Sequence, residues 1–330
     1  HVQVSNARLA RRAFLLTLWL KFVTDRRALL VDAFADEPLA GNPAGVVPDA
    51  DDLTDAQMRA VAHELNASET AFVRASDAAD RRLRFFSSAT EVDLCGHATV
   101  AAHAHLRQAG ALSAGAYTVE TNAGVFDIEV TAEGVVWLAV ETPTVDEVDA
   151  DLNRVGDALG VDPAALRDVG ADLPLAVAST GLPYLVVPVN FLARLGEADP
   201  NDAAVVALAD EYDAVGVYAF TFDAIDRDST LHGRMFAPGL GIPEDPVTGT
   251  ASGAVAGYCR AVEAFDGDPP AEMRCEQGHF VDRPGVARVR FESSEADESG
   301  ATVWVGGTAV TALDGRLSVP ADDDDGIIEV

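Results

Sequence analysis

Two stretches of the chain, Glu91-Val92-Asp93-Leu94-Cys95-Gly96-His97-Ala98-Thr99 and Glu244-Asp245-Pro246-Val247-Thr248-Gly249-Thr250-Ala251-Ser252, decide the fold. They align at a constant offset of 153 residues, with a glutamate, a glycine and an alanine identical and a final threonine matched to a serine. Each follows an Arg-x-Phe sequence typical of a strand and precedes a run of small residues typical of a buried helix. Because the same order of features occurs twice, the sequence predicts a duplicated structural unit.

The chain length and these features predict two domains in an α+β fold. A chain of 330 residues exceeds the usual size of one core, and a connection rich in Pro, Asp and Glu occupies residues 142–151. Compact side chains on a helix flanked by strands suit a helix enclosed by a curled sheet. We therefore expect two pseudosymmetric domains, residues 29–142 and 143–330, each a curled β-sheet or barrel around a central helix.

Local signals predict further elements around the repeat. Thr54 and Gln57 form a capping-box pattern before an apolar helical periodicity, which predicts a helix over residues 54–65. Asn201 is a typical N-cap for another helix. Alternating apolar residues predict strands on both sides of each glycine-led helix, and the first strand is expected to begin at Leu29.

The first 28 residues differ in composition from the rest of the chain. They hold six basic residues and one acidic residue, and their apolar run at 14–20 resembles a short signal-peptide core. Lys21 interrupts this run, no clean small-residue cleavage site follows it, and it is too short to span a bilayer. We expect residues 1–28 to be an extension outside the fold, with a targeting role as the alternative.

The charge of the chain excludes some classes of partner. The net charge is −31, the pI is near 4.3, and Lys21 is the one lysine. Nucleic acids and anionic membranes are therefore poor partners. An ordinary acidic surface is one interpretation, but lysine depletion together with excess carboxylates favours adaptation to salt, which screens self-repulsion. We expect a cytoplasmic protein of a salt-accumulating halophile.

Cysteine and histidine spacing predicts neither a disulfide framework nor a metal centre. Cys95, Cys259 and Cys275 form no CxxC pair, and the seven histidines give no zinc-site spacing with them. His103 and His105 lie along the first glycine-led helix without an HExxH pattern, and we expect them to be packing residues. The sequence therefore predicts no metal site.

Gly96 and Gly249 stand where a loop turns into a helix. Unpaired backbone N–H groups and the positive end of the helix dipole meet at such a point, so each is suited to binding an anion. If the two halves face each other, both helix starts converge on one pocket, which would hold a substrate carboxylate and stabilise an enolate-like charge beside it. Tight helix entries without a ligand are the alternative for either glycine alone, and the pairing favours a shared site.

Three polar residues near these glycines are candidates for proton transfer. Glu69 lies at the edge of an apolar strand, where partial desolvation would raise the pKa of a carboxylate toward that of a general base, although most glutamates in so acidic a chain are solvated. His97 is suited to donating to a substrate oxygen, to relaying a proton or to a local hydrogen bond. Asp245 is suited equally to capping a helix and to catalysis.

Cys95 directly precedes the first helix start, an environment that lowers the pKa of a thiol. A two-thiol mechanism would need a second cysteine at the equivalent position, which is Thr248. We therefore expect Cys95 to be a small pocket-lining residue.

Several motifs, taken in order, resemble one protein family. They are Val31-Asp32-Ala33-Phe34, Gly41-Asn42-Pro43-Ala44-Gly45-Val46-Val47, Ser68-Glu69-Thr70-Ala71-Phe72-Val73, Leu94-Cys95-Gly96-His97-Ala98-Thr99, Glu244-Asp245-Pro246-Val247-Thr248-Gly249 and Gln277-Gly278. Across residues 29–292 the chain resembles the phenazine-biosynthesis-like isomerase family. The resemblance implies the diaminopimelate-epimerase fold, with the active site between two pseudosymmetric domains, and a homodimer.

This resemblance also implies roles for individual residues. Glu69 matches the family's proton-shuttling glutamate, which takes a proton from a carbon near the substrate carboxylate and returns it elsewhere. His97, Asp245 and Thr250 match residues that orient the substrate and assist the transfer, with Thr250 in place of a more common serine. Asn42 matches a pocket asparagine in the loop after the first strand.

With Gly96 and Gly249 binding the substrate carboxylate, these matches predict a cofactor-independent isomerase in which Glu69 is the single acid/base. A racemase or epimerase of amino or hydroxy acids on the same fold is the closest alternative, and it requires two bases on opposite faces of one carbon. A non-catalytic protein that binds small carboxylates is the second alternative. Residues 278–285 depart from the glycine-arginine turn usual in the family, so the resemblance does not define this part of the second domain.

Overall fold

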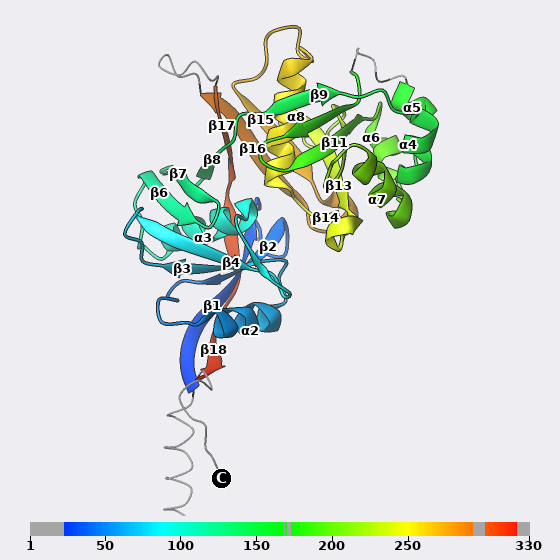
Figure 1. Cartoon of the computed structure of the whole chain (residues 1–330). Coiled ribbons are helices and arrows are strands. Elements are labelled where there is room, and N and C mark those ends of the chain that lie inside the picture. The colour runs from blue at the N-terminus through cyan, green and yellow to red at the C-terminus, as the bar shows by residue number, and fades with distance from the viewer. Residues whose placement is uncertain (1–22, 168, 170–172, 293–300, 322–330) are drawn as a thin grey trace, which may run out of the picture.

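The computed structural model describes residues 23–167, 169, 173–292 and 301–321. These residues form an elongated molecule with two lobes, one drawn mainly in blue and cyan and the other in green to orange (Figure 1). We call them the first half and the second half. None of the described helices is long and apolar enough to cross a membrane.

The first half is a curled sheet around helix α3. Its elements are β1 (Val23–Ala33), β2 (Asn42–Val47), α2 (Asp55–Leu65), β3 (Thr70–Arg74), β4 (Arg81–Phe86), β5 (Glu91–Val92), α3 (Gly96–Gln108), β6 (Gly115–Thr121), β7 (Gly124–Val130), β8 (Val136–Val140) and β18 (Ala309–Pro320). Helix α3 contacts β1, β2, β8 and β18, so strands from both ends of the chain cover it.

The second half repeats this plan around helix α8. Its elements are β9 (Thr144–Glu147), α4 (Leu152–Leu159), α5 (Ala164–Arg167), β10 (Ala176–Ser179), β11 (Pro183–Pro188), α6 (Leu192–Gly196), α7 (Asp202–Glu211), β12 (Gly216–Thr221), β13 (Leu231–Ala237), η1 (Pro238–Leu240), β14 (Ile242–Asp245), α8 (Gly249–Ala261), β15 (Glu272–Gln277), η2 (His279–Val281), β16 (Gly285–Glu292) and β17 (Thr302–Gly307). Helices α4 to α7 lie on the outer side of this half, away from the first (Figure 1).

Strand order confirms the predicted duplication. In the first half β2 and β3 are parallel, β3 and β4 antiparallel, and β4 and β6 parallel. The corresponding pairs β11–β12, β12–β13 and β13–β15 have the same directions in the second half. The two sheets join where β8 pairs antiparallel with β17. The predicted α+β fold, with two pseudosymmetric sheets each curled around one helix, is therefore confirmed.

The repeated motifs keep the same contacts in both halves. Arg84 makes a bidentate ion pair with Glu91, with both N–O distances 2.7 Å, and Arg234 makes the equivalent pair with Glu244 at 2.9 and 2.6 Å. Each arginine also stacks on a phenylalanine two residues later in its strand. A planar guanidinium that is held on two sides fixes the turn leading into the helix. The sequence repeat therefore preserves the geometry of both helix entries.

Small residues on the central helices are required by the closeness of the surrounding strands. A Cβ atom on Gly253 would lie 2.9 Å from Val305 Cγ2, and one on Gly257 would lie 2.4 Å from Pro143 Cβ. Larger side chains there would force the helix away from the sheet. Pro143 belongs to the connection between the halves, so this connection packs directly on α8.

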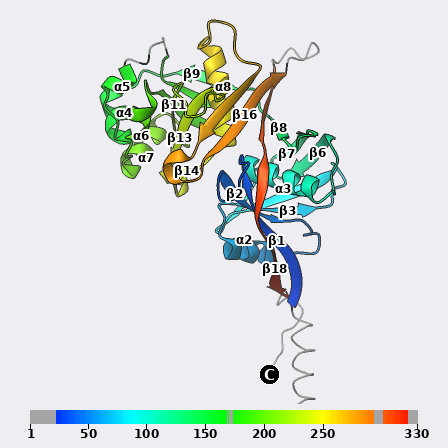
Figure 2. The same cartoon turned by 180° about the vertical axis from the view of Figure 1, so that it is seen from behind.

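Two predicted boundaries differ from the structure. Residues 23–28 form the start of β1, because they pair with residues 315–320 of β18, and only residues 1–22 of the expected extension lie outside the described residues. Strand β18 joins the first half although it ends the described chain, so a contiguous second domain at 143–330 does not describe it. Figure 2 shows β17 and β18 as an almost continuous path from one half to the other.

Candidate active site

Glu69 and His97 lie side by side in the first half. Glu69 directly precedes β3, and its carbonyl oxygen accepts a hydrogen bond from the Gly45 N–H of β2 at 2.9 Å. His97 is the second residue of α3, and its Nε2 atom lies 3.5 Å from Glu69 Oε2 and 3.2 Å from Ser68 Oγ. The side chain of His97 is 12% exposed and that of Glu69 is 19% exposed. Both are therefore mostly shielded from solvent yet open to a small ligand.

Cys95 completes this cluster but differs from the prediction for its thiol. Its Sγ atom lies 3.8 Å from Glu69 Oε2 and 3.4 Å from His97 Nδ1. Burial, followed by the negative charge of Glu69, raises the pKa of the Cys95 thiol well above its usual value. These effects outweigh the helix N-terminus, which was predicted to lower this pKa. Cys95 is therefore a protonated, packed thiol in the free protein.

Asp245 connects the two halves from the end of β14. Its Oδ1 atom accepts a hydrogen bond from Asn42 Nδ2 at 2.9 Å, and its Oδ2 atom accepts one from the Thr248 hydroxyl. Asn42 is the first residue of β2 and also donates to the Val247 carbonyl oxygen at 2.8 Å. Asp245 makes no cap bond to α8, because the N-cap is Thr248, so the capping interpretation of this carboxylate is wrong.

The electrostatics of Asp245 show that residues from both halves meet at one site. Burial raises the pKa of this carboxyl group, and the charge of Glu69 raises it further. His97 and hydrogen bonds from Thr248 and Asn42 lower this pKa. The hydrogen bond from Asn42 of the first half to Asp245 of the second brings the two halves together at this carboxyl group.

The two predicted helix starts differ in the space around them. Neither N-cap residue, Cys95 or Thr248, makes a side-chain cap hydrogen bond, and α3 contacts α8. A Cβ atom on Gly96 would meet no heavy atom within 4 Å, whereas one on Gly249 would lie 3.0 Å from Phe34 Cζ. Open space for a ligand therefore lies beside Gly96, and Gly249 is required by packing.

Thr250, the remaining predicted ligand-binding residue, is oriented by a residue that sequence analysis missed. The Tyr184 hydroxyl on β11 lies 2.8 Å from Thr250 Oγ1, and Thr180 Oγ1 donates to the Thr250 carbonyl at 3.0 Å. Tyr184 is almost fully buried, and burial raises the pKa of its phenol, so it remains neutral. No local motif marks Tyr184, because its relation to Thr250 arises only when β11 packs against α8.

Further residues that position the site also come from strand packing. Phe34, with a φ of 62°, places its buried ring against Gly249. Gln277 donates to the Asp245 carbonyl oxygen at 2.6 Å and holds the turn before α8. Both residues belong to the quoted motifs, so their importance was visible in the sequence although their contacts were not.

An ion pair between the halves fixes the loop that carries Asn42. Arg283 donates from Nη2 to Asp32 Oδ1 at 2.6 Å and from Nε to the Gly41 carbonyl oxygen at 2.9 Å. Asp32 is 2% exposed and also accepts from the Leu39 N–H at 2.7 Å. Arg283 lies in residues 278–285, the segment that departs from the family pattern, and it supplies an arginine that spans the two halves.

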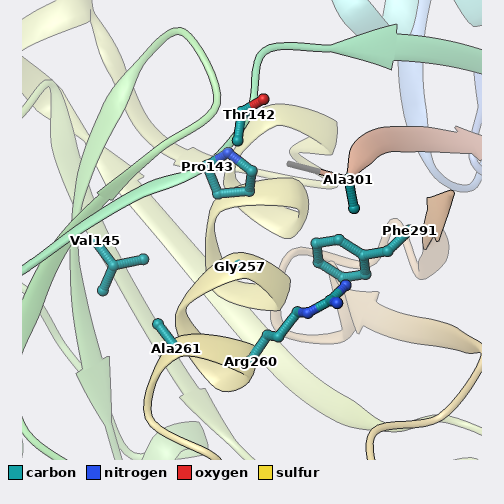
Figure 3. A pocket seen from close by; sticks show the side chains of 8 residues that line it. All are labelled: Thr142, Pro143, Val145, Gly257, Arg260, Ala261, Phe291 and Ala301. Atoms are coloured by element: carbon teal, nitrogen blue, oxygen red, sulfur yellow. The ribbon is translucent and has the colours of Figure 1, made fainter. Parts of the chain in front are cut away.

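Other predicted features have plain outcomes. His103 and His105 are buried in α3, as predicted, and burial lowers the pKa of His103 to about 4. The three cysteines are free thiols. A hollow of about 380 Å³ near the C-terminal part of α8 is lined by Arg260 and Phe291, whose cation–π distance is 4.9 Å (Figure 3). It contains none of the predicted site residues.

Solved structures share this architecture. The Bacillus anthracis phenazine biosynthesis protein of the PhzF family matches with a TM-score of 0.81 and 31% identity, covering 89% of this chain and 99% of that one. A hydroxyproline epimerase from Agrobacterium vitis, solved with bound trans-4-hydroxy-L-proline, matches at 14% identity with a TM-score of 0.55, covering 92% of this chain and 94% of that one, and shows the fold alone. The architecture is the diaminopimelate-epimerase-like fold.

Sequence comparison defines the class and then the family. An uncharacterized isomerase of Bacillus subtilis strain 168, YfhB, is 34% identical over 293 residues, covering 87% of this chain and 96% of the relative. The chain is thus an enzyme of the isomerase class. Residues 31–315 match the family described as phenazine biosynthesis-like protein. The protein belongs to this family.

Proposed function

We propose that the enzyme moves a proton between carbon atoms of a small carboxylate substrate, with Glu69 as the single acid/base. The observation that carries this proposal is the placement of a shielded carboxylate 3.5 Å from His97 Nε2 at the start of α3. A glutamate in such a position reaches a substrate carbon and returns the proton to another carbon of the same molecule. We further propose that the reaction needs no resident cofactor.

The substrate carboxylate binds, in this proposal, at the start of α3. Space beside Gly96 and the absence of a side-chain cap leave the first backbone N–H groups of the helix directed toward a ligand. These donors also stabilise the negative charge that develops when a proton leaves the carbon next to the carboxylate. Thr250, oriented by Tyr184, supplies a hydroxyl from the opposite helix.

His97 and Asp245 assist the transfer. His97 lies between Ser68 Oγ and Glu69 and donates to substrate oxygen or orients the glutamate. Asp245 has a raised pKa because it is buried, so it exchanges a proton more readily near neutral pH than an exposed aspartate. Asn42 holds this carboxyl group in place.

An epimerase acting through two residues is the second candidate. Asp245 comes from the opposite half to Glu69, and the raised pKa of its carboxyl group suits a second acid/base. Such a pair would invert one carbon rather than move a proton between two. Stereochemical analysis of the product distinguishes the two reactions.

Hydrogen exchange in heavy water tests the role of Glu69. We expect wild-type protein to introduce deuterium into at least one member of a panel of unsaturated, amino and hydroxy carboxylates, and Glu69→Gln to slow this by roughly 10³-fold or more. Glu64→Gln, an exposed glutamate on α2, is the matched control and should exchange like wild type. Equal exchange by Glu69→Gln and wild type would refute the proposed acid/base.

A further inference from the structure

The cluster formed by Glu69, Cys95 and His97 has a property beyond hydrogen bonding. One carboxylate oxygen, one sulfur and one ring nitrogen lie within 4.8 Å of one another. Oxygen, sulfur and nitrogen donors of these three kinds are the ones that zinc takes in proteins. The three residues were not grouped by sequence analysis, because Glu69 is 26 residues from Cys95.

The distances between the donor atoms approach those around a tetrahedral zinc ion. Nε2 of His97 is 3.5 Å from Glu69 Oε2, and Sγ of Cys95 is 3.8 Å from Oε2 and 3.9 Å from Nε2. Zinc bonds of about 2.0–2.3 Å at tetrahedral angles separate such donors by roughly 3.3–3.6 Å. Each separation would therefore contract by only a few tenths of an ångström, within the reach of small rotations of the three side chains.

The charge of the site also favours a cation. Glu69 brings a carboxylate to the cluster, and zinc binds a cysteine as its thiolate with release of the thiol proton. The positive end of α3 opposes a cation by about 1 kcal/mol at most, which is small beside bonds to three donors. Gly96 stands between Cys95 and His97, and a Cβ atom on it would meet no heavy atom within 4 Å, which leaves room for a fourth ligand beside the cluster.

We propose that Glu69, Cys95 and His97 form a binding site for Zn²⁺ and that zinc binding inhibits the enzyme. Three protein ligands and an open fourth position give a site that binds zinc together with water or a substrate carboxylate. Coordination occupies the Glu69 oxygen that would accept a proton from carbon. This inference rests on the proposed role of Glu69 for the inhibition, whereas the binding itself depends only on the three side chains.

Direct binding tests the site without any substrate. The full chain, freed of metal by a chelator, is titrated with Zn²⁺ in competition with a chromophoric chelator. We expect one equivalent to bind with a dissociation constant of about 1 µM or lower, and Cys95→Ser to weaken it by about tenfold or more. Cys259→Ser and Cys275→Ser remove buried thiols outside the cluster and should bind zinc like wild type.

Two further readouts separate this site from other metal binding. Co²⁺ bound at the cluster should show sulfur-to-cobalt charge-transfer absorption that Cys95→Ser removes, whereas adventitious binding to surface carboxylates would not show it. His97→Gln, with the thiol intact, should also weaken zinc binding, and it provides the test if Cys95→Ser does not fold. Zinc binding that is equal in wild type, Cys95→Ser and His97→Gln, or absent in wild type, would overturn the proposal.

Inhibition is measured with the exchange assay. One equivalent of Zn²⁺ should suppress deuterium incorporation at least tenfold, and EDTA should restore it. Unchanged or faster exchange with zinc bound would overturn the inhibitory role. Loss of exchange in Glu69→Gln without zinc binding in wild type would refute the metal site alone, and zinc binding with normal exchange in Glu69→Gln would refute the acid/base role alone.

Discussion

Asp245 is a buried carboxyl group whose ionised form lowers the stability of the folded protein. Its carboxyl group is 8% exposed and accepts hydrogen bonds from Asn42 and Thr248. Burial raises the pKa of this carboxyl group, so its ionised form is less favourable in the folded protein than in the unfolded chain. An ionised carboxylate in this position is costly, and a protein retains such a cost where the group serves function.

The raised pKa of Asp245 predicts how the stability of Asp245→Asn, relative to wild type, depends on pH. The raised pKa means that the wild-type carboxyl group contributes its full stability below about pH 3.8 and loses it as pH rises through the folded pKa. We expect Asp245→Asn to match wild type near pH 4 and to be more stable by about 1 kcal/mol at pH 7, with loss of activity.

Denaturant unfolding at a series of pH values measures this difference. Asp223→Asn, an exposed aspartate in the same half, serves as the control. A difference between Asp245→Asn and wild type that is constant across this range would contradict the burial argument.

Residue patterns drew attention to individual side chains of the candidate site but did not reveal their contacts. Gly96, His97 and Thr250 were found because each stands in a repeated motif at a helix start. Tyr184 and Arg283 were missed because neither has a local signature, and each contacts a segment far away in the sequence, the start of α8 for Tyr184 and the turn before β2 for Arg283. The prediction that the helix start lowers the pKa of the Cys95 thiol was wrong. Burial, which the sequence does not reveal, raises this pKa and outweighs the helix dipole.

At the scale of the elements, the two central helices are alike in structure and unequal in surroundings. Both begin at a glycine after an uncapped N-cap residue. Phe34 and Val305 press on the start of α8, whereas the start of α3 is open. We therefore propose that α3 binds the ligand and that the start of α8 is a rigid side of the same site.

Alanine substitution at the two glycines tests this proposal. A Cβ atom on Gly249 would lie 3.0 Å from Phe34 Cζ and 3.2 Å from Val305 Cγ1, so we expect Gly249→Ala to lower the free energy of unfolding by about 1–3 kcal/mol. Gly96→Ala should change it by less than about 0.5 kcal/mol while weakening ligand binding, because its methyl group enters the ligand space. Thermal unfolding measures the stability of each variant, and ligand titration measures its affinity. A destabilised Gly96→Ala with normal ligand binding, together with a stable Gly249→Ala with weakened binding, would contradict this prediction.

Capping patterns in the sequence predicted where two of the helices begin. The capping box at Thr54 and the N-cap at Asn201 both form as predicted. Helices α4, α5 and α6 were not predicted, because segments of eight, four and five residues are too short to show a helical period. Strand β18 could not be assigned to its sheet, because pairing between distant strands is decided by the packed fold.

Across the whole molecule, the acidic surface suggests dependence on salt. A net charge of −31 repels itself strongly when the Debye length is long. Salt adaptation of a cytoplasmic enzyme, and assembly as a homodimer, remain proposals of this account.

Salt titration tests the first of them. We expect the free energy of unfolding to fall by about 2 kcal/mol or more when KCl is reduced from 1 M to 0.1 M, because the Debye length then grows from about 3 Å to about 10 Å. A neutral osmolyte added at low salt controls for water activity. Equal stability at both salt concentrations would contradict salt adaptation and would support the interpretation of an ordinary acidic surface.

The central claim is that groups from the two halves face each other across one site. The most direct measurement is the pKa of Asp245. It is obtained from the NMR signal of the Asp245 carboxyl carbon, in protein labelled in aspartate, and Asp245→Asn assigns that signal. Because His97 lowers this pKa and Glu69 raises it, we expect the Asp245 pKa to rise in His97→Gln and to fall in Glu69→Gln. An Asp245 pKa that stays the same in both variants would contradict a site shared by the two halves.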